Sequence, residues 1–300
     1  MWFTYALITS VAWGCADLFY KKGSNPADKL SHLKIVVMVG LVMGLHAFIY
    51  MFANKIEFSP ISIVQYLPVS SMYILSMTLG YVGLRYIELS ISSPIQNSSG
   101  AVAAILCFIF LGQRMQSFQY VAVALICAGL VLLGVFQRRQ EDQIRLQRQE
   151  VVDAKYRTGL WAMIFPLLYC LVDGLGTFLD ALYLDEGAIM SEDTALLAYE
   201  FTFFICALVA WVYIAFVKKE SFNVFKERDR GLAAVFEMGG QFFYVFAMAE
   251  NAIIAAPMIA SYSIFSVLFS RIFLKEKLTR LQYLMVMIVM LGILILGLEV

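Results

Sequence analysis

Residues 94–134 read PIQNSSGAVAAILCFIFLGQRMQSFQYVAVALICAGLVLLG, and residues 257–297 read PMIASYSIFSVLFSRIFLKEKLTRLQYLMVMIVMLGILILG. The two stretches align without a gap. Each has a proline, an apolar segment, a short polar break and a second apolar segment. The matched pairs include Pro94 with Pro257, Ser98 with Ser261, Gln119 with Gln282 and Gly129 with Gly292. The pattern indicates a tandem duplication, and duplicated hydrophobic halves are typical of transporter folds.

The composition indicates a protein embedded in lipid. Hydrophobic residues make up 61% of the chain, charged residues only 15%, and the mean hydropathy is +0.79, whereas soluble domains carry roughly 25% charged residues. The formal net charge is zero, and no basic stretch alternates with aromatic residues, which excludes a nucleic-acid partner. The five cysteines lie inside apolar runs without metal-ligand spacing, so we expect neither a metal site nor a cofactor.

The number of apolar segments predicts how often the chain crosses the membrane. A crossing helix needs about 20 mostly apolar residues. On this basis the sequence predicts an all-α integral membrane protein with ten transmembrane helices, at about 2–20, 33–53, 61–84, 90–111, 117–136, 159–182, 194–217, 231–249, 252–274 and 280–298. Residues 1–136 and 159–300 are predicted to form two repeats of five helices. Residues 137–158, rich in Arg, Gln and Glu, are predicted to form a charged, solvated helical linker, with a partner-binding site as the alternative.

The odd number of helices in each repeat decides the symmetry. A repeat that crosses the membrane five times places the next repeat in the opposite orientation, so the two repeats are predicted to be inverted. Inverted repeats are related by a pseudo-two-fold axis in the membrane plane. Two such halves can exchange their inward-open and outward-open conformations around a central site.

Several motifs resemble a known family. Ala12-Trp13-Gly14 stands near the end of the first predicted helix, and the two polar breaks are Phe110-Leu111-Gly112-Gln113-Arg114 and Phe273-Leu274-Lys275-Glu276-Lys277. These features are similar to the EamA repeats of the drug/metabolite transporter superfamily, over nearly the whole chain. The resemblance implies this fold and a transport function but no particular substrate, since similar proteins are associated with amino acids, choline, sugars and nucleotide-sugars. The chain departs from the family pattern at Gln113 and at Tyr169-Cys170.

Ionisable side chains inside the predicted helices are candidates for function, because each costs several kcal/mol unless it faces a cavity or a partner. They are mostly acidic, with His46 and Arg271 as the potential cations. The acidic residues are Asp17, Asp173, Asp180, Glu200 and Glu237, and the neutral polar residues Gln96, Asn97 and Gln241 add hydrogen-bonding groups.

An aromatic ring precedes an aspartate by four residues in each half, as Trp13 and Asp17 and as Tyr169 and Asp173. This spacing places ring and carboxylate on one helical face, where a desolvated organic cation gains charge attraction and a cation–π contact of ~0.5–2 kcal/mol. The alternative is that Asp17 reaches water near the end of its helix while the rings are interfacial or packing residues.

Asp180 follows Asp173 by two helical turns, and Glu237 shares a face with Gln241. Such a column of carboxylates along a cavity wall suits proton exchange. The positions of Asp180 and Glu200 near helix ends favour solvated sites at a cavity mouth. For His46, a bond to a neighbouring helix carbonyl is the simpler interpretation, and a proton relay is the alternative.

Gly40 and Gly44 form a GxxxG pattern that allows another helix to approach closely. Such a pattern serves packing within the fold or in a dimer. Because this helix must pack within its own half, we expect the contact to lie within the fold.

The sequence thus predicts a secondary active transporter in the cell membrane, moving a small, amine-bearing or cationic metabolite by alternating access with proton coupling. The partners are the small-molecule substrate, protons and lipids, for a monomer or homodimer. Predicted substrate-binding residues are Trp13, Asp17, Gln96, Asn97, Tyr169, Asp173, Glu237 and Gln241, and predicted proton-coupling residues are Asp173, Asp180 and Glu237.

Two alternatives remain at this point. One is a transporter of a neutral metabolite such as an amino acid or a sugar. The other is a non-transporting membrane subunit, or a protein that binds lipid or a partner. An enzyme is not expected, because the chain has no HExxH or GxSxG motif and no paired His-carboxylate metal motif.

The distribution of basic residues predicts the orientation. Of 22 Lys and Arg residues, all except Lys55 and Arg114 fall on the face that carries the loops between helices 1–2, 3–4, 5–6, 7–8 and 9–10. By the positive-inside rule that face is cytoplasmic, so both termini are extracytoplasmic, contrary to the usual orientation of similar proteins. A C-terminal reporter that is active only in the cytoplasm should stay silent; bright signal from it would show the opposite orientation.

Overall fold

The computed structural model describes residues 1–23, 28, 30–83, 96, 98–148, 164–186, 189–273 and 279–297. Nearly all of these residues are helical, and the described ranges contain no strand. The helices in the first part of the chain are α1 (Trp2–Gly23), α2 (Ser31–Ala53), α3 (Ile61–Gln65), α4 (Leu67–Gly83), α6 (Ser99–Leu106) with the π-helical turn Cys107–Leu111, and α7 (Ser117–Arg148).

The second part of the chain follows a similar order. Its helices are α8 (Ile164–Ala181) with the π-helical turn Leu182–Glu186, α9 (Glu192–Val212) with the π-helical turn Tyr213–Val217, the short 3-10 turn Val224–Lys226, α10 (Arg228–Ala260), α11 (Tyr262–Phe273) and α12 (Arg280–Gly297).

Three helices differ from the sequence prediction. The helix predicted at 61–84 is divided into α3 and α4, with Pro68 in the first turn of α4, where a proline is tolerated because its missing N–H has no partner there. The helix predicted at 117–136 continues to Arg148, into the charged linker. The helix predicted at 252–274 is interrupted at Ser261, between the end of α10 and the start of α11. The boundary predicted between the eighth and ninth helices is present as a kink inside α10 at Asn251, whose backbone angles are not helical.

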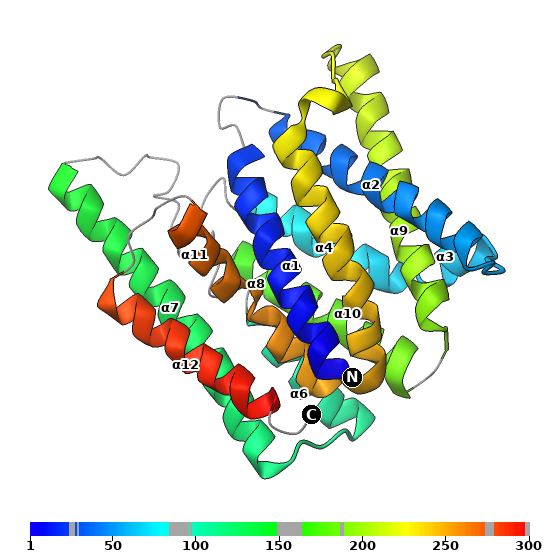
Figure 1. Ribbon diagram of the computed structural model, residues 1–300. Coiled ribbons are helices and arrows are strands. Elements are labelled where there is room, and N and C mark those ends of the chain that lie inside the picture. The colour runs from blue at the N-terminus through cyan, green and yellow to red at the C-terminus, as the bar shows by residue number, and fades with distance from the viewer. Residues whose placement is uncertain are drawn as a thin grey trace.

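The helices are arranged as a central group between two outer pairs (Figure 1). Helices α7 and α12 lie side by side at one edge, and α2 and α9 cross at the other. Between them α1 packs along α10, and α4 packs along α8. The hydrogen bond from Thr9 Oγ1 to the carbonyl oxygen of Gly240 (3.1 Å) joins the first of these pairs, and Ser76 joins α4 to Asp173 on α8.

Small residues allow the outer pairs to approach closely. A methyl group at Gly40 would lie 2.2 Å from the carbonyl oxygen of Phe203, and one at Gly44 would lie 2.3 Å from the ring of Phe204. The GxxxG pattern of α2 therefore packs against α9 within the fold, as predicted.

The other outer pair, α7 and α12, is packed in the same way at both of its glycines. Gly129 faces Val289, and Gly292 faces Ile126. The alignment of the duplicated stretches pairs Gly129 with Gly292 and Ile126 with Val289. The two contacts are therefore reciprocal under that alignment.

The length and the apolar composition of its helices, together with the sequence composition, indicate that this is a multi-pass membrane protein. Six helical stretches are long and apolar enough to cross a membrane, and Leu67–Met77 and Ser99–Leu111 are shorter apolar helices. The stretch Arg228–Phe273 has 46 residues, about twice the ~20 that one crossing needs, and it is kinked at Asn251. Large apolar side chains such as Phe52, Ile109 and Phe216 are exposed on the helix surfaces, as expected where they face lipid.

The contact between α2 and α9 gives a test of the packing. Gly40→Ala places a methyl group against the carbonyl oxygen of Phe203 and should destabilise the protein by about 1–3 kcal/mol, the usual cost of overpacking. The matched control is Gly239→Ala in α10, where an added methyl group meets nothing within 4 Å. Thermal unfolding in detergent should show a lower Tm for Gly40→Ala alone; equal Tm values for both variants would contradict the close contact.

Candidate functional site

A cavity of about 270 Å³ lies among the central helices. Residues from α1, α4, α6, α8, α9, α10 and α11 line it, so segments from both parts of the chain contribute. The lining consists of Trp13, Asp17, Tyr20, Tyr73, Met77, Gln96, Ser99, Gly100, Tyr169, Asp173, Thr177, Tyr199, Glu237, Gln241, Tyr244, Ala256, Ile259, Ala260 and Tyr262.

The lining residues come mostly from the middle parts of the helices. Trp13, Asp17 and Tyr20 lie in the second half of α1, and α10 contributes residues on both sides of its kink at Asn251. The first part of α10 runs antiparallel to α1, since Met1 pairs with Glu250 (2.7 Å) while Gly23 contacts Arg230. The face where α1 ends is therefore the face where α10 begins.

Seven of the eight predicted substrate-binding residues line this one cavity, and the eighth, Asn97, is outside the described residues. The ring and the carboxylate of each predicted pair lie on the lining together, Trp13 with Asp17 and Tyr169 with Asp173. Glu237 and Gln241 also lie there together. Whether these residues bind a substrate remains a prediction.

Trp13 has a packing role as well. Its Nε1 donates a hydrogen bond to the backbone oxygen of Glu237 (3.3 Å), and its ring stacks on Tyr244 with 5.4 Å between centroids. It also meets the ring of Tyr262 edge-on at 5.9 Å. These contacts hold the indole in the cavity wall, so the proposed aromatic surface is rigid.

The carboxylate of Asp173 is hydrogen-bonded to a side chain of α4. The hydroxyl of Ser76 donates to its carboxylate (3.1 Å), and Thr177, one turn later, donates to its backbone oxygen (3.0 Å). The carboxylate thus has a fixed position in the cavity wall.

Three tyrosines bind Asp180 next to the cavity. The hydroxyls of Tyr73 and Tyr244, which line the cavity, donate to Oδ2 of Asp180 at 2.8 and 2.9 Å, and Tyr66 donates to Oδ1. The hydroxyls of Tyr73 and Tyr244 are 2.6 Å apart. Because Tyr66 precedes α4 and Asp180 lies in the last turn of α8, this cluster lies on the side of the cavity away from the face where α1 ends.

The solvated positions predicted for Asp180 and Glu200 are wrong, because both carboxylates are completely buried. The end of α8 packs among tyrosines, so closeness to a helix end does not bring Asp180 to water. His46 does not bond to a helix carbonyl as expected. Its Nδ1 lies 2.8 and 2.9 Å from the two carboxylate oxygens of Glu200.

Tyr73, Tyr199 and Tyr244 belong to the cavity wall but were not among the predicted site residues. Tyrosine is common in apolar helices, and hydropathy alone does not separate a ring in a cavity from one in lipid. A weak signal existed for Tyr244, since the repeat alignment pairs it with Tyr81.

The chemistry of the lining is acidic and aromatic. Asp17, Asp173 and Glu237 contribute carboxyl groups, and seven aromatic residues surround them. Within the part of the chain that the structure describes, no Lys, Arg or His lines the cavity. Such a surface favours a cation, through charge attraction and cation–π contact, and disfavours an anion.

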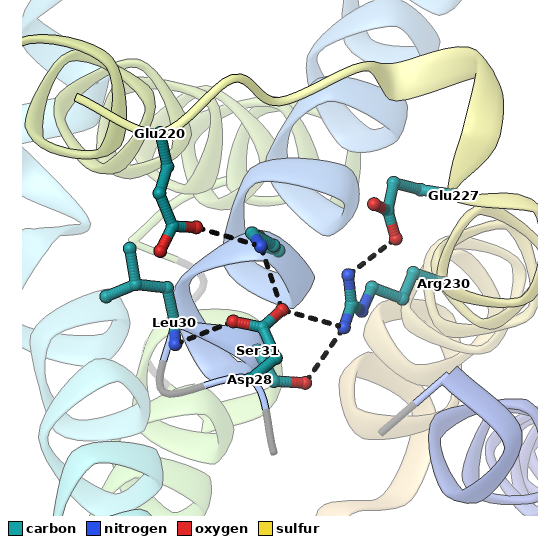
Figure 2. A network of polar contacts seen from close by, with 7 residues as sticks. Asp28, Leu30, Ser31, Glu220, Glu227 and Arg230 are labelled. Atoms are coloured by element: carbon teal, nitrogen blue, oxygen red, sulfur yellow. Dashed lines mark hydrogen bonds and ion pairs between the residues drawn. The ribbon is translucent and has the colours of Figure 1, made fainter. Parts of the chain in front are cut away.

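A second polar cluster ties the start of α2 to the start of α10 (Figure 2). Lys34 Nζ lies 2.8 Å from Asp28 and 3.1 Å from Glu220. Arg230, which is only 5% exposed, pairs with Glu227 (2.5 Å), donates to Ser31 (2.9 Å) and lies 3.6 Å from Asp28. We call these six residues, Asp28, Ser31, Lys34, Glu220, Glu227 and Arg230, the Arg230 cluster.

The pKa of Asp28 reflects this cluster. Burial raises the pKa, but hydrogen bonds from Lys34 and from the N–H of Leu30, with the charges of Lys34 and Arg230, outweigh burial and leave the pKa below its usual value. A carboxyl whose pKa is lowered on folding stabilises the folded state at neutral pH. That contribution is lost as the pH falls below the unfolded pKa, about 3.9, and through the folded one.

Removing the charge of Arg230 should therefore be costly at neutral pH. Arg230→Gln leaves Asp28 and Glu227 without their buried partner, a change that costs about 3–5 kcal/mol when a buried ion pair is broken. We expect a clearly lower Tm at neutral pH. The difference from wild type should shrink as the pH falls below about 3.9, the unfolded value, and through the lowered pKa of Asp28. Lys226→Gln, at an exposed position nearby, is the control. A deficit for Arg230→Gln that is independent of pH would contradict a charge effect.

Comparison with known proteins agrees with this architecture. A protein of known crystal structure is similar over 99% of this chain and 96% of its own, with a TM-score of 0.72 at 9% identity, a likeness that shows the fold alone. No curated protein sequence matches the chain. The sequence pattern of the EamA-like transporter family matches residues 1–135 and residues 160–298. The chain therefore belongs to the EamA-like transporter family.

Proposed function

We propose that this protein is a secondary active transporter of a small metabolite that bears an amine or another cationic group. Membership of a transporter family supports transport itself. The single observation that supports the cation preference is the central cavity, in which three carboxyl groups and seven aromatic rings meet without a basic side chain among the described residues. Its volume of about 270 Å³ is just below the ~300–1,000 Å³ of typical ligand pockets, which suits a small molecule.

The transport cycle that we propose is alternating access by two inverted repeats of five helices, residues 1–136 and 159–300. The two family matches support this division. The reciprocal contacts of Gly129 with Val289 and of Gly292 with Ile126 are those expected for two-fold related helices. Gly297 lies against Phe3, so the two ends of the described chain are on one face, as an even number of crossings requires.

In this cycle the cavity opens to each face of the membrane in turn. The tyrosines that bind Asp180 lie between the cavity and the face where α9 begins, and we propose that this cluster separates the cavity from that face. The positive-inside rule makes that face extracytoplasmic.

Proton coupling requires only that the substrate and a proton compete for the same carboxylate. In our proposal Asp173 holds either the cationic group of the substrate or a proton, because a proton removes the charge that attracts the cation, and a bound cation disfavours the proton. Glu237 and Asp180 add further carboxyl groups next to the same space. Substrate and proton therefore move in opposite directions.

A neutral metabolite is the second candidate. Gln96, Gln241, Ser99 and Thr177 also line the cavity, and their amide and hydroxyl groups can bind hydroxyl or carbonyl groups of an uncharged molecule. The two candidates differ in one respect: only the cation depends on the charge of Asp173.

Substitution of Asp173 tests the proposal. Ethanolamine and ethylene glycol, one charged and one neutral, have similar size and serve as probes, beside a wider panel of amines and neutral metabolites. Asp173→Asn should abolish pH-gradient-driven uptake of the amine into proteoliposomes and weaken amine binding at least about tenfold, ~1.4 kcal/mol. Binding of neutral probes should change less. Asp229→Asn, in the first turn of α10 and outside the cavity, is the control.

The result that would overturn the proposal is equally specific. If Asp173→Asn transports amines with unchanged affinity and unchanged pH dependence, the carboxylate is structural. Binding of the neutral probes alone by the wild-type protein would favour the second candidate.

A further inference from the structure

A buried ionisable pair lies outside the cavity, between α2 and α9. Glu200 is completely buried, and its two carboxylate oxygens lie 2.8 and 2.9 Å from Nδ1 of His46, whose side chain is 21% exposed. Neither residue lines the cavity, although Tyr199, the neighbour of Glu200, does. The transport mechanism proposed above does not use this pair.

The pair belongs to a polar column between the same two helices. One turn further along α2, the hydroxyl of Tyr50 donates to Asp193 (2.7 Å), in the first turn of α9. The rings of His46 and Tyr50 stack with 5.6 Å between centroids. The column thus extends from the face where α9 begins inward to Glu200.

Other ionisable groups lie near the pair on α2 and α9, and further ones lie beyond them on α10 and α8. On α2 and α9 these are Tyr50, Asp193 and Tyr199. Beyond Tyr199 lie Glu237 on α10 and Asp173 and Asp180 on α8. His46 is therefore the basic group in a mainly acidic surrounding, and Phe242 of α10 covers its ring edge-on at 5.8 Å.

The protonation state of such a pair matters energetically. A single buried carboxylate without a compensating charge is costly, whereas one proton shared between imidazole and carboxylate makes the pair neutral overall. Loss of that proton leaves one net negative charge among apolar and acidic neighbours. The pair can lose its proton only where water or a hydrogen-bonded path can accept it.

We propose that His46 and Glu200 form a second proton-binding site, separate from the cavity carboxylates, which exchanges its proton with the face where α9 begins. The ligand is a single proton. It is held between Nδ1 of His46 and the Glu200 carboxylate, and on release it passes to water on the Asp193 side.

The location of the site links its proton to the conformation. His46 lies in the first family match and Glu200 in the second, so relative movement of the two halves separates the partners. Separation opens Glu200 to the Asp193 side and favours release, while return of the proton favours the conformation described here. This linkage is reciprocal. Its role in transport rests on the proposed function, but the existence of the site does not.

The first experiment follows the imidazole directly. The chain has two histidines, His32 and His46, so ring-nitrogen NMR of histidine-labelled full-length protein in lipid nanodiscs gives two signal sets, and His32→Gln assigns them. At one fixed pH the Nδ1 signal of His46 should show a nitrogen hydrogen-bonded to a carboxylate, and Glu200→Gln should shift that signal while the His32 signal stays in place. A His46 signal that is unaffected by Glu200→Gln would overturn the proposal.

The second experiment separates this site from the cavity without any substrate. Proteoliposomes on a solid-supported membrane are given a pH jump, and the transient charge displacement by proton binding is recorded. Asp173→Asn should keep one component of the transient, and Glu200→Gln should lose that component. Glu250→Gln, at a carboxylate paired with the N-terminus on the surface, should match wild type.

A double substitution, referred to as the paired variant, serves as the control for misfolding. His46→Gln with Glu200→Gln restores a neutral hydrogen bond between the helices, so it should keep a near-wild-type Tm and still lack the component. If Glu200→Gln and the paired variant both retain the full transient, the second site does not exist. If Asp173→Asn fails to affect amine uptake while Glu200→Gln shifts the His46 signal and removes the component, the substrate proposal fails and this one stands.

Discussion

Close contact between helix backbones is the constraint on which the rest of this structure depends, because lipid supplies no hydrophobic force between helices. Glycines provide that contact next to the cavity. Gly14 packs against Phe265 of α11, and Gly174 packs against Val102 of α6. Gly14 directly follows the cavity residue Trp13, and Gly174 directly follows the cavity residue Asp173. Since neighbours on a helix point about 100° apart, the glycine contact aims the adjacent side chain into the cavity.

Much of the fold could be predicted from the sequence. Long apolar segments can be recognised from neighbouring residues, and the repeat can be recognised by aligning the chain with itself. The membrane-embedded helical character, the family and the packing of Gly40 and Gly44 within the fold are confirmed. The bend at Asn251 lies where a boundary between two helices was predicted. Hydropathy could not show that the helix predicted at 252–274 is interrupted at Ser261. It also could not show that the predicted helical linker continues α7 without a break as far as Arg148, because charged residues outside the membrane form helices too.

The candidate site was predicted less completely, and the reason is the range of the contacts involved. The spacing of Trp13 and Asp17 is local and visible in the sequence. The bonds of Glu200 to His46 and of Asp180 to Tyr66 join residues 154 and 114 positions apart, and helical periodicity contains no information about such pairs. Distance from a helix end was a poor guide to hydration, since neighbouring helices cover both carboxylates.

The place of Trp13 also has an optical consequence. The chain has four tryptophans. Of these, Trp2 stands at the start of α1, Trp211 is 41% exposed among lipid-facing side chains, and Trp161 lies outside the described residues. Trp13 alone among the three described tryptophans lines the cavity, stacked on Tyr244. Its indole therefore senses the polarity of whatever fills that space, so the protein has an intrinsic fluorophore whose emission reports on the cavity without a label.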